Sequence, residues 1–118
     1  MSKDIIDFIE FENFKAEPNR VNADWKVNKD IPFFEGHFPG NPILPAVCII
    51  DISLYLLSLQ NPEVSLQKIE IKRSKFMAMV RPEQDVEIVA ESDDEKTWKV
   101  LWQAKKDQQK LVQISVVI

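Results

Sequence analysis

Apolar and polar residues alternate along several segments of this chain, a pattern typical of strands that bury one face. Between residues 21 and 27 every second residue is apolar, and the residues between them are polar or charged. The same alternation predicts four further strands, at residues 68–72, 85–88, 98–104 and 112–118. Residues 8–15 are predicted to form a sixth strand that turns at 16–19, with a short helix as the alternative.

One segment, from Pro45 to Gln60, lacks this alternation and is apolar on nearly every side of a helix. Pro45 suits the first turn of a helix, where its missing N–H is not needed, and Asn61-Pro62 ends the run. A helix that is apolar all round is expected to be buried all round. One buried helix among six strands predicts an α+β domain in which an antiparallel sheet wraps around one long central helix.

The predicted helix carries one carboxylate, Asp51, near its middle. Cys48, Asp51, Tyr55 and Ser58 are three or four residues apart, so they line one stripe of the helix. A carboxylate among Val, Ile and Leu is costly unless it is paired, neutralised or facing a wet cavity. Asp51 is therefore a candidate functional group, with a buried structural carboxylate as the alternative. Cys48 is expected to be a small core residue rather than a nucleophile.

Length and composition limit the classes of protein that this chain can represent. With 118 residues it is expected to be one domain, residues 1–118, and its 45% hydrophobic and 29% charged residues are typical of a soluble globular protein. The longest apolar stretch, 43–59, falls short of a membrane-spanning helix, and the first residues lack the order of a signal peptide. We therefore expect a cytoplasmic protein without a membrane partner. The net charge of −4 argues against nucleic acid.

The counts of cysteine and histidine restrict the cofactors. The single cysteine excludes an intrachain disulfide and a cysteine-based zinc cage, and the single histidine leaves few good ligands for a transition metal. The chain also has no glycine-rich phosphate loop. We therefore expect neither a metal nor an organic cofactor.

The two glycines and the only histidine of the chain all fall between residues 36 and 40. Average usage would supply about eight glycines, so glycine is kept here for a positive-φ turn or for a close approach to the backbone. Four of the seven prolines stiffen the same stretch. Because His37 is the only side chain that ordinarily titrates near neutral pH, this stretch is a candidate site; a histidine that merely completes a turn is the alternative.

Residues 34–45, with the sequence FEGHFPGNPILP, resemble the active-site segment of the hot-dog-fold β-hydroxyacyl-acyl-carrier-protein dehydratases of the FabZ and FabA types. In that family a G-H-F-P-G-x-P-x-x-P-G segment leads into the central helix, which carries an acid 14 residues after the histidine. Asp51 occupies that position. Lys75-Phe76 and Val80-Arg81-Pro82 are similar to a later K-F and V-x-P motif, so the resemblance covers roughly residues 20–90.

The sequence departs from the family pattern at three places. Ala46 replaces a glycine, Tyr55 replaces the usual glutamine four residues after the acid, and Pro82-Glu83-Gln84 replaces a P-G-D turn. Because that glutamine is associated with holding the acid, Tyr55 is expected to orient Asp51 from the next helical turn. The resemblance therefore implies a short, divergent member, of the kind that serves a specialised pathway such as aryl polyene synthesis.

The resemblance implies dehydration of a 3-hydroxyacyl thioester, carried on acyl carrier protein, to a trans-2-enoyl thioester. His37 would act as the base and Asp51 as the proton donor, which burial among apolar residues would keep protonated. Backbone N–H groups would stabilise the thioester oxygen. The implied backbone donors are Ala46 and Gly40, and the implied substrate-binding residues are Phe38, Pro39, Pro45, Cys48 and Tyr55.

The implied partner is an acyl carrier protein with a phosphopantetheine-linked acyl group. A basic cluster is expected either to dock this acidic partner or to be a solvated strand face: Lys72, Arg73, Lys75 and Arg81. A homodimer or higher homo-oligomer is expected, or a hetero-oligomer with a related dehydratase, because an isolated copy would expose a sheet edge and the Asp51 stripe. In the family the histidine and the acid come from opposite subunits.

Two other functions stay open at this point. A hot-dog thioesterase would use the acid to direct water at the thioester, but such enzymes generally lack the intact histidine segment. A non-catalytic subunit that supports an active partner is favoured by the loss of the glutamine and glycine. Retention of both His37 and Asp51 opposes it.

Overall fold

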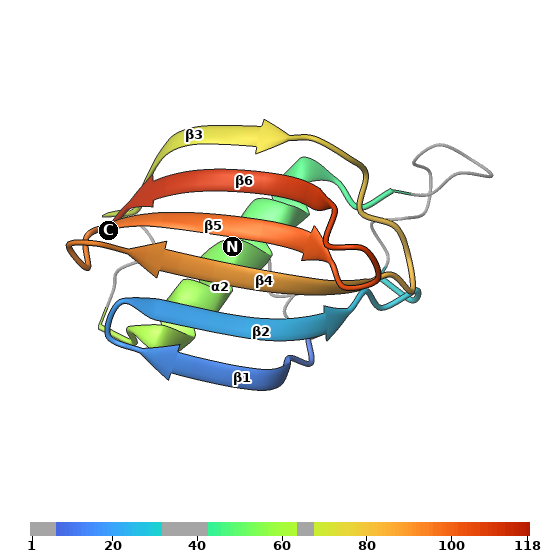
Figure 1. The fold of residues 1–118 in the computed structure, drawn as a ribbon, viewed down its shortest axis with the longest axis horizontal. Coiled ribbons are helices and arrows are strands. Elements are labelled where there is room, and N and C mark those ends of the chain that lie inside the picture. The colour runs from blue at the N-terminus through green and yellow to red at the C-terminus, as the bar shows by residue number, and fades with distance from the viewer. Residues whose placement is uncertain (1–6, 32–42, 64–67) are drawn as a thin grey trace.

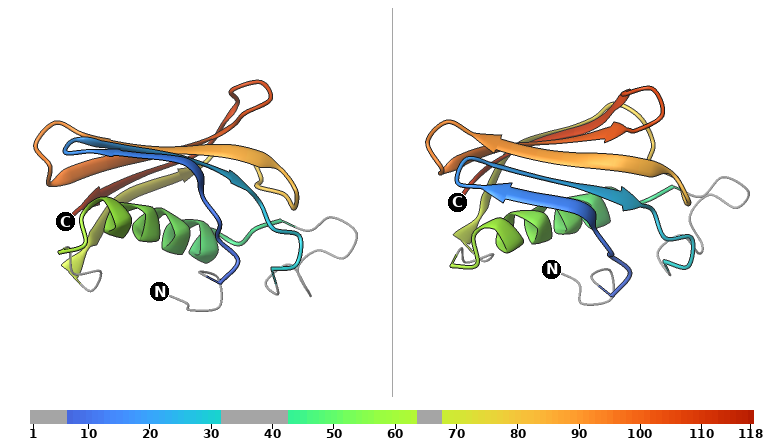
Figure 2. Two further views of the ribbon diagram at one scale, coloured as in Figure 1. Left: turned by 90° about the horizontal axis from the view of Figure 1, so that it is seen from below. Right: turned by 60° about the horizontal axis from the view of Figure 1, so that its bottom comes forward.

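The computed structural model describes residues 7–31, 43–63 and 68–118. In this part of the chain six strands form one antiparallel sheet, and a single helix, α2, lies against its concave face (Figures 1 and 2). The spatial order is β1-β2-β4-β5-β6-β3. The strands are β1 (Glu12–Glu17), β2 (Arg20–Lys26), β3 (Glu70–Phe76), β4 (Asp85–Ser92), β5 (Thr97–Ala104) and β6 (Lys110–Val117). The predicted sheet wrapped around one central helix is confirmed.

The four inner strands follow the alternation that predicted them. Along each one, a buried apolar side chain faces the helix and the next residue is more exposed, with few exceptions. All three tryptophans lie in this core, as expected for large apolar side chains. Full burial of each aliphatic side chain contributes about 1.5–3 kcal/mol, so the inner face of the sheet supplies much of the stability.

Helix α2 (Ala46–Gln60) has the predicted length. Pro45 is its N-cap in an extended conformation, and the N–H of Asn61 donates to the carbonyl of Leu57 at the other end. Gln60 donates from its side-chain amide to the carbonyl of Glu17, which ties the end of the helix to the β1–β2 turn.

The expectation that α2 is buried all round is wrong for a single chain, because the sheet covers only one face of the helix. Val47 is 63% exposed, and Leu59 is exposed as well. The side chains buried in this contact are those of Cys48, Ile49, Ile52, Ser53, Leu56 and Leu57.

β3 is an edge strand, and every one of its residues is exposed in the single chain. It was expected to be half-buried and to end at residue 72, but it continues to Phe76. A bulge between Ile71 and Arg73 shifts the alternation. Phe76 therefore pairs with Val112, which faces the helix, whereas Lys75 pairs with Gln113 on the outer face.

The other edge strand, β1, starts at Glu12 and not at Phe8 as predicted. Residues 7–11 leave the plane of the sheet and run toward the open side of α2 (Figure 2). Phe11 packs there against Tyr55, and Phe8 and Ile9 pack against the core. The apolar side chains of this segment are therefore buried by packing against the helix and the core, and the segment does not pair as a strand. The alternative of a short helix at 8–15 is excluded.

The β4–β5 turn depends on the carboxylate of Asp94, which accepts hydrogen bonds from the backbone N–H groups of Thr97 (2.7 Å) and Lys96 (2.9 Å). These bonds to the ionised form lower the pKa of Asp94 below its usual value. Its stabilising contribution is therefore complete at neutral pH and is lost as the pH falls through the lowered pKa of the folded state.

We predict that Asp94→Ala lowers the melting temperature by several degrees at neutral pH, because two N–H groups lose their acceptor. The difference from the unchanged protein should shrink in acid, where Asp94 is protonated in both states. Thermal unfolding followed by circular dichroism between neutral and acidic pH measures this, with Asp93→Ala in the same turn as the control. A constant difference at all pH values would contradict the role of the ionised carboxylate.

Candidate active site

The N-terminus of α2 presents backbone donors at one end of the sheet. The first intrahelical bonds are donated by Cys48 and Ile49 to the carbonyl of Pro45, so the N–H groups of Ala46 and Val47 precede them. Pro45 supplies no capping side chain, and the first turn has no acidic residue. These N–H groups thus lie at the positive end of the helix dipole, where they can donate to an oxygen that gains negative charge.

An apolar cavity of about 350 Å³ lies beside this helix end. The N–H of Leu44 donates to the carbonyl of Val80 at 2.7 Å, which joins the approach to the helix to the segment after β3. The lining residues are Ile43, Leu44, Ala46, Ile49, Phe76, Met77, Ala78, Met79 and Val80. The cavity can hold an apolar group next to the backbone donors, which is the arrangement that an acyl thioester requires.

Asp51 lies on the side of α2 that turns away from the sheet. Ser53 faces the sheet, and two residues correspond to a rotation of about 200° around a helix. Asp51 is half-buried. The predicted acid is therefore one to two turns from the helix N-terminus, on the face that the sheet leaves uncovered.

Cys48 is buried in the core, one turn before Asp51. Burial, together with the negative charge of Asp51, raises the pKa of the Cys48 thiol to about 11. The thiol is therefore protonated at neutral pH and is a poor nucleophile. This agrees with the prediction of a small core residue, while its place in the substrate path stays a prediction.

The stripe of Cys48, Asp51, Tyr55 and Ser58 is less exposed in the single chain than we expected. Tyr55 stacks on Phe11 with ring centroids 6.0 Å apart, and the Ser58 hydroxyl donates to the carbonyl of Tyr55 at 2.6 Å. Phe11 was missed as a neighbour of the site because its segment was interpreted as a strand.

A second missed feature is a buried hydrogen bond between the helix and the sheet. The indole N–H of Trp102 donates to the hydroxyl of Ser53 at 2.9 Å, and that hydroxyl donates to the carbonyl of Ile49 at 2.8 Å. The alternation of β5 predicted that Trp102 is buried. No signal in the sequence indicates that the Ser53 hydroxyl accepts a hydrogen bond from the indole N–H of Trp102.

The four predicted docking residues do not form a single cluster. Arg73 and Lys75 lie together on the outer face of β3, while Lys72 forms an ion pair with Glu70 at 2.9 Å. Arg81 follows the segment that lines the apolar cavity, and its guanidinium lies 3.5 Å from the sulfur of Met79. Lys75 and Arg81 thus flank the two ends of residues 76–80.

Four other predicted site residues, His37, Phe38, Pro39 and Gly40, lie outside the described residues. Pro45 and Ala46 are described and stand at the start of α2. The structure therefore places one predicted backbone donor, Ala46, in the lining of the apolar cavity, whereas the predicted acid, Asp51, lies on the same helix but does not line that cavity. The position of the base stays a prediction.

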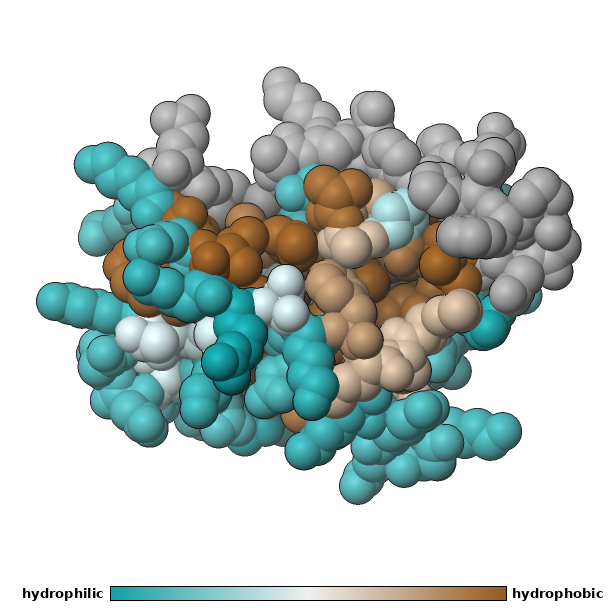
Figure 3. All heavy atoms as spheres, turned by 90° about the horizontal axis from the view of Figure 1, so that it is seen from above, coloured by the Kyte–Doolittle hydropathy of each residue, from teal (hydrophilic) through white to brown (hydrophobic). Residues whose placement is uncertain are grey.

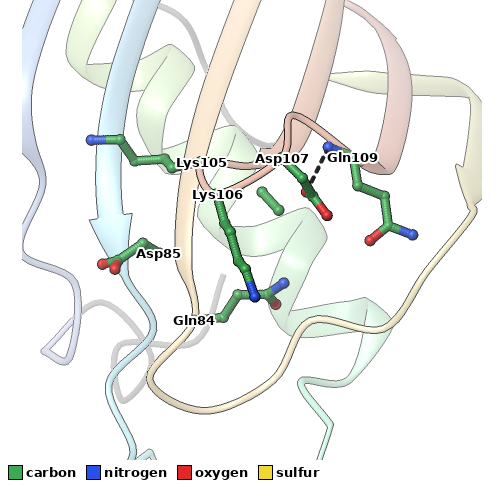
Figure 4. Close-up of a pocket in the computed structure, with 7 residues that line it drawn as sticks. Gln84, Asp85, Lys105, Lys106, Asp107 and Gln109 are labelled. Carbon is green, nitrogen blue, oxygen red and sulfur yellow. Dashed lines mark hydrogen bonds between the residues drawn. The ribbon is translucent and has the colours of Figure 1, made fainter.

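A larger hollow of about 540 Å³ lies elsewhere, at the turn between β5 and β6 (Figure 4). Lys106 extends toward Gln84 on one side of it, whereas Lys105 points away and donates to Asp24 at 2.8 Å. None of the predicted site residues lines this hollow. Six of its seven lining residues are charged or carry an amide group, and such a lining does not suit an acyl chain.

Comparisons with known proteins identify the class. The family model described as "ApeI-like: ApeI dehydratase" matches residues 13–115. The chain is 31% identical over 105 residues to the 3-hydroxyacyl-[acyl-carrier-protein] dehydratase FabZ of Rickettsia bellii, covering 79% of this chain and 71% of that protein. It is 43% identical over 72 residues to the FabZ of Ehrlichia chaffeensis, where it covers 55% of this chain but only 49% of the relative. The chain spans about half the length of this relative and of the Chlamydia pneumoniae FabZ.

Solved structures confirm the hot-dog fold. A chain of the dehydratase heterocomplex ApeI:P from Xenorhabdus doucetiae matches with a TM-score of 0.78 at 18% identity, covering 92% of this chain and 96% of that one. Zebra fish thioesterase superfamily member 2 matches with a TM-score of 0.63 at 16% identity, covering 96% and 82%. The protein is thus a hot-dog-fold protein of the dehydratase class. Within that class it belongs to the ApeI-like dehydratase family.

Proposed function

We propose that this chain dehydrates 3-hydroxyacyl thioesters, carried on acyl carrier protein, to trans-2-enoyl thioesters. The observation that carries the proposal is the position of Asp51, on the open face of α2 and 14 residues after the histidine of a G-H-F-P-G segment, in a member of a dehydratase family. The apolar cavity and the backbone donors at the start of α2 support it.

In the proposed reaction the imidazole of His37 removes the α-proton of the substrate. The electron pair of that C–H bond moves toward the thioester oxygen, where the N–H groups of Ala46 and Gly40 stabilise the negative charge. The pair then forms the new C=C bond while the C–O bond breaks. Asp51 gives its proton to the departing hydroxide, so that water leaves. His37 then releases its proton to solvent and Asp51 takes one up, which returns both groups to their starting states before the next turnover.

We predict that His37→Ala and Asp51→Asn each lower kcat for dehydration by about 10²–10⁴-fold, which is the usual contribution of a general acid or base. Asp51→Asn keeps the volume and hydrogen-bonding reach of the side chain but removes its transferable proton, so the fold should be retained. The measurement is steady-state turnover of a 3-hydroxybutyryl thioester, with circular dichroism as the check on folding. Tyr55→Phe should reduce activity less severely. Full activity in Asp51→Asn would refute the dyad.

The exposed edge at β3 supports an assembly of two chains. Figure 3 looks onto this edge, where hydrophobic side chains gather in a band with hydrophilic residues below it. Ile71, Phe76, Met77 and Met79 are among the large apolar residues exposed here. An unpaired strand with an apolar border is a ready surface for pairing. We propose that a second copy pairs along β3, so that His37 of one subunit meets Asp51 of the other.

We predict a dimer by light scattering at micromolar concentration. Ile71→Glu should produce monomers, because it places a charge in the apolar border of β3. Phe14→Glu is the matched control, since Phe14 and Ile71 are each 41% exposed but lie on opposite edges of the sheet. If the chain is monomeric alone and associates only when a related dehydratase is added, the assembly is a hetero-oligomer and not a homodimer. Monomers under both conditions would contradict the assembly.

The carrier protein is proposed to dock near Arg73 and Lys75. Both side chains are exposed on the outer face of β3, which ends where the lining of the apolar cavity begins. Local positive charge can steer an acidic carrier although the whole chain has a net charge of −4.

We predict that the double variant Arg73→Glu and Lys75→Glu slows association with an acidic carrier protein by about tenfold or more at low salt. Added salt should weaken the binding of the unchanged protein in the same direction. Surface plasmon resonance measures the rates. Turnover of a small thioester without a carrier should not change.

The matched control reverses the charges of Lys26 and Lys29, which are exposed near the end of β2. Normal carrier binding by the Arg73 and Lys75 variant would show that these residues form only a solvated face.

A further inference from the structure

We propose that the buried hydrogen bond between Trp102 and Ser53 sets the rotation of α2 and thereby the direction of Asp51. Trp102 and Ser53 would then be positioning residues, which act on the reaction through the helix and not by touching the substrate. The catalytic consequence rests on the proposed function, whereas the setting of the helix does not.

The hydrogen bond lies in an interface that is otherwise apolar. Ser53 is 1% exposed and Trp102 is fully buried. The Ser53 hydroxyl accepts from the indole N–H at 2.9 Å and donates to the carbonyl of Ile49 at 2.8 Å, so its donor and one acceptor site are both used. A buried indole N–H that loses its acceptor has no access to water, so a rotated helix would leave it unsatisfied.

The sheet holds Trp102 firmly in place. Its backbone pairs with Ile88 of β4 on one side and with Val112 of β6 on the other. Its ring meets Trp25 of β2 edge to face, with centroids 6.1 Å apart and an interplanar angle of 89°. The indole N–H is therefore a fixed reference point on the sheet, to which the helix must adjust.

Apolar packing alone specifies the rotation of α2 only weakly. The helix is apolar on nearly every side, so a turned helix would still present aliphatic side chains to the sheet. Hydrophobic contact is non-directional, whereas a hydrogen bond requires one distance and one angle. A single buried polar contact can thus select one arrangement among several similar apolar ones, as a buried asparagine selects the register of a coiled coil.

Because Ser53 and Asp51 lie on the same helix, fixing the direction of Ser53 also fixes the direction of Asp51. Because Ser53 is fixed toward the sheet, Asp51 lies about 200° away on the open face, and Cys48 stays in the core. Tyr55, at the position where the resembled family has glutamine, stacks on Phe11. The Ser53 contact therefore provides an orientation of the acid that does not depend on that glutamine.

The reactivity of the Cys48 thiol measures the rotation of α2 independently of enzymatic activity. It is the only cysteine, it is 2% exposed, and its pKa is raised to about 11. A rotation that brought it toward solvent would return its pKa toward the usual value, and a fall of one unit increases the thiolate fraction about tenfold.

The experiment compares Ser53→Ala with Ser53→Thr, which retains the hydroxyl, and with Ile88→Val as a control for mild destabilisation in the same layer of the core. In the folded protein, iodoacetamide should alkylate Cys48 at least fivefold faster in Ser53→Ala than in the unchanged protein or in Ile88→Val. Ser53→Thr should restore protection. For dehydration, Ser53→Ala should lower kcat about tenfold with little change in KM, while Ile88→Val should leave both unchanged.

Equal protection of Cys48 in Ser53→Ala and the unchanged protein would overturn the proposal, as would equal acceleration in Ile88→Val. Should Ser53→Ala fail to fold, Trp102→Phe removes the donor while the Ser53 hydroxyl keeps its bond to Ile49, and it should give the same acceleration. If the unchanged protein dehydrates no hydroxyacyl thioester, the proposed function fails, but the alkylation rates still decide whether the contact sets the helix.

Discussion

The packing of α2 into the concave face of the sheet is the contact on which the rest of the candidate site depends. It buries an aliphatic face of the helix and leaves Asp51 on the opposite side. It also brings the N–H groups of the first turn beside the segment after β3, where the bond from Leu44 to Val80 joins the two. The packing of α2 against the sheet thus determines where the acid, the backbone donors and the apolar cavity lie.

The same packing explains why a single chain exposes apolar side chains and an unpaired strand edge. One sheet can cover only one face of a helix, so Val47 stays exposed on α2. At the same time β3 ends the sheet with every residue exposed. Hydrophobic side chains gather along this edge of the sheet (Figure 3). A second chain along β3 would satisfy the strand edge and cover these side chains.

Much of this architecture could be predicted from the sequence, because period-two alternation and an uninterrupted apolar run reflect burial directly. The helix at 46–60 and the inner strands follow from those patterns. Ile71 was misjudged because its alternation shows a potential for burial, which an edge strand realises only with a partner. Residues 8–11 were misjudged as strand because Phe11 packs on Tyr55, and Phe8 and Ile9 on the core, instead of pairing in the sheet. The Ser53 contact depends on tertiary structure, which the sequence pattern does not show. The role of His37 stays a prediction from its motif.

The proposed activity of this chain is the removal of water from a hydroxyacyl thioester. The most direct test is incubation of the purified protein with a 3-hydroxybutyryl-carrier substrate and with the crotonyl-carrier product, followed by mass spectrometry of the carrier. We expect interconversion of the two species, with loss or gain of one water and an intact thioester. Release of free carrier thiol would instead indicate a thioesterase. No change in either substrate would contradict dehydratase activity and favour a non-catalytic subunit.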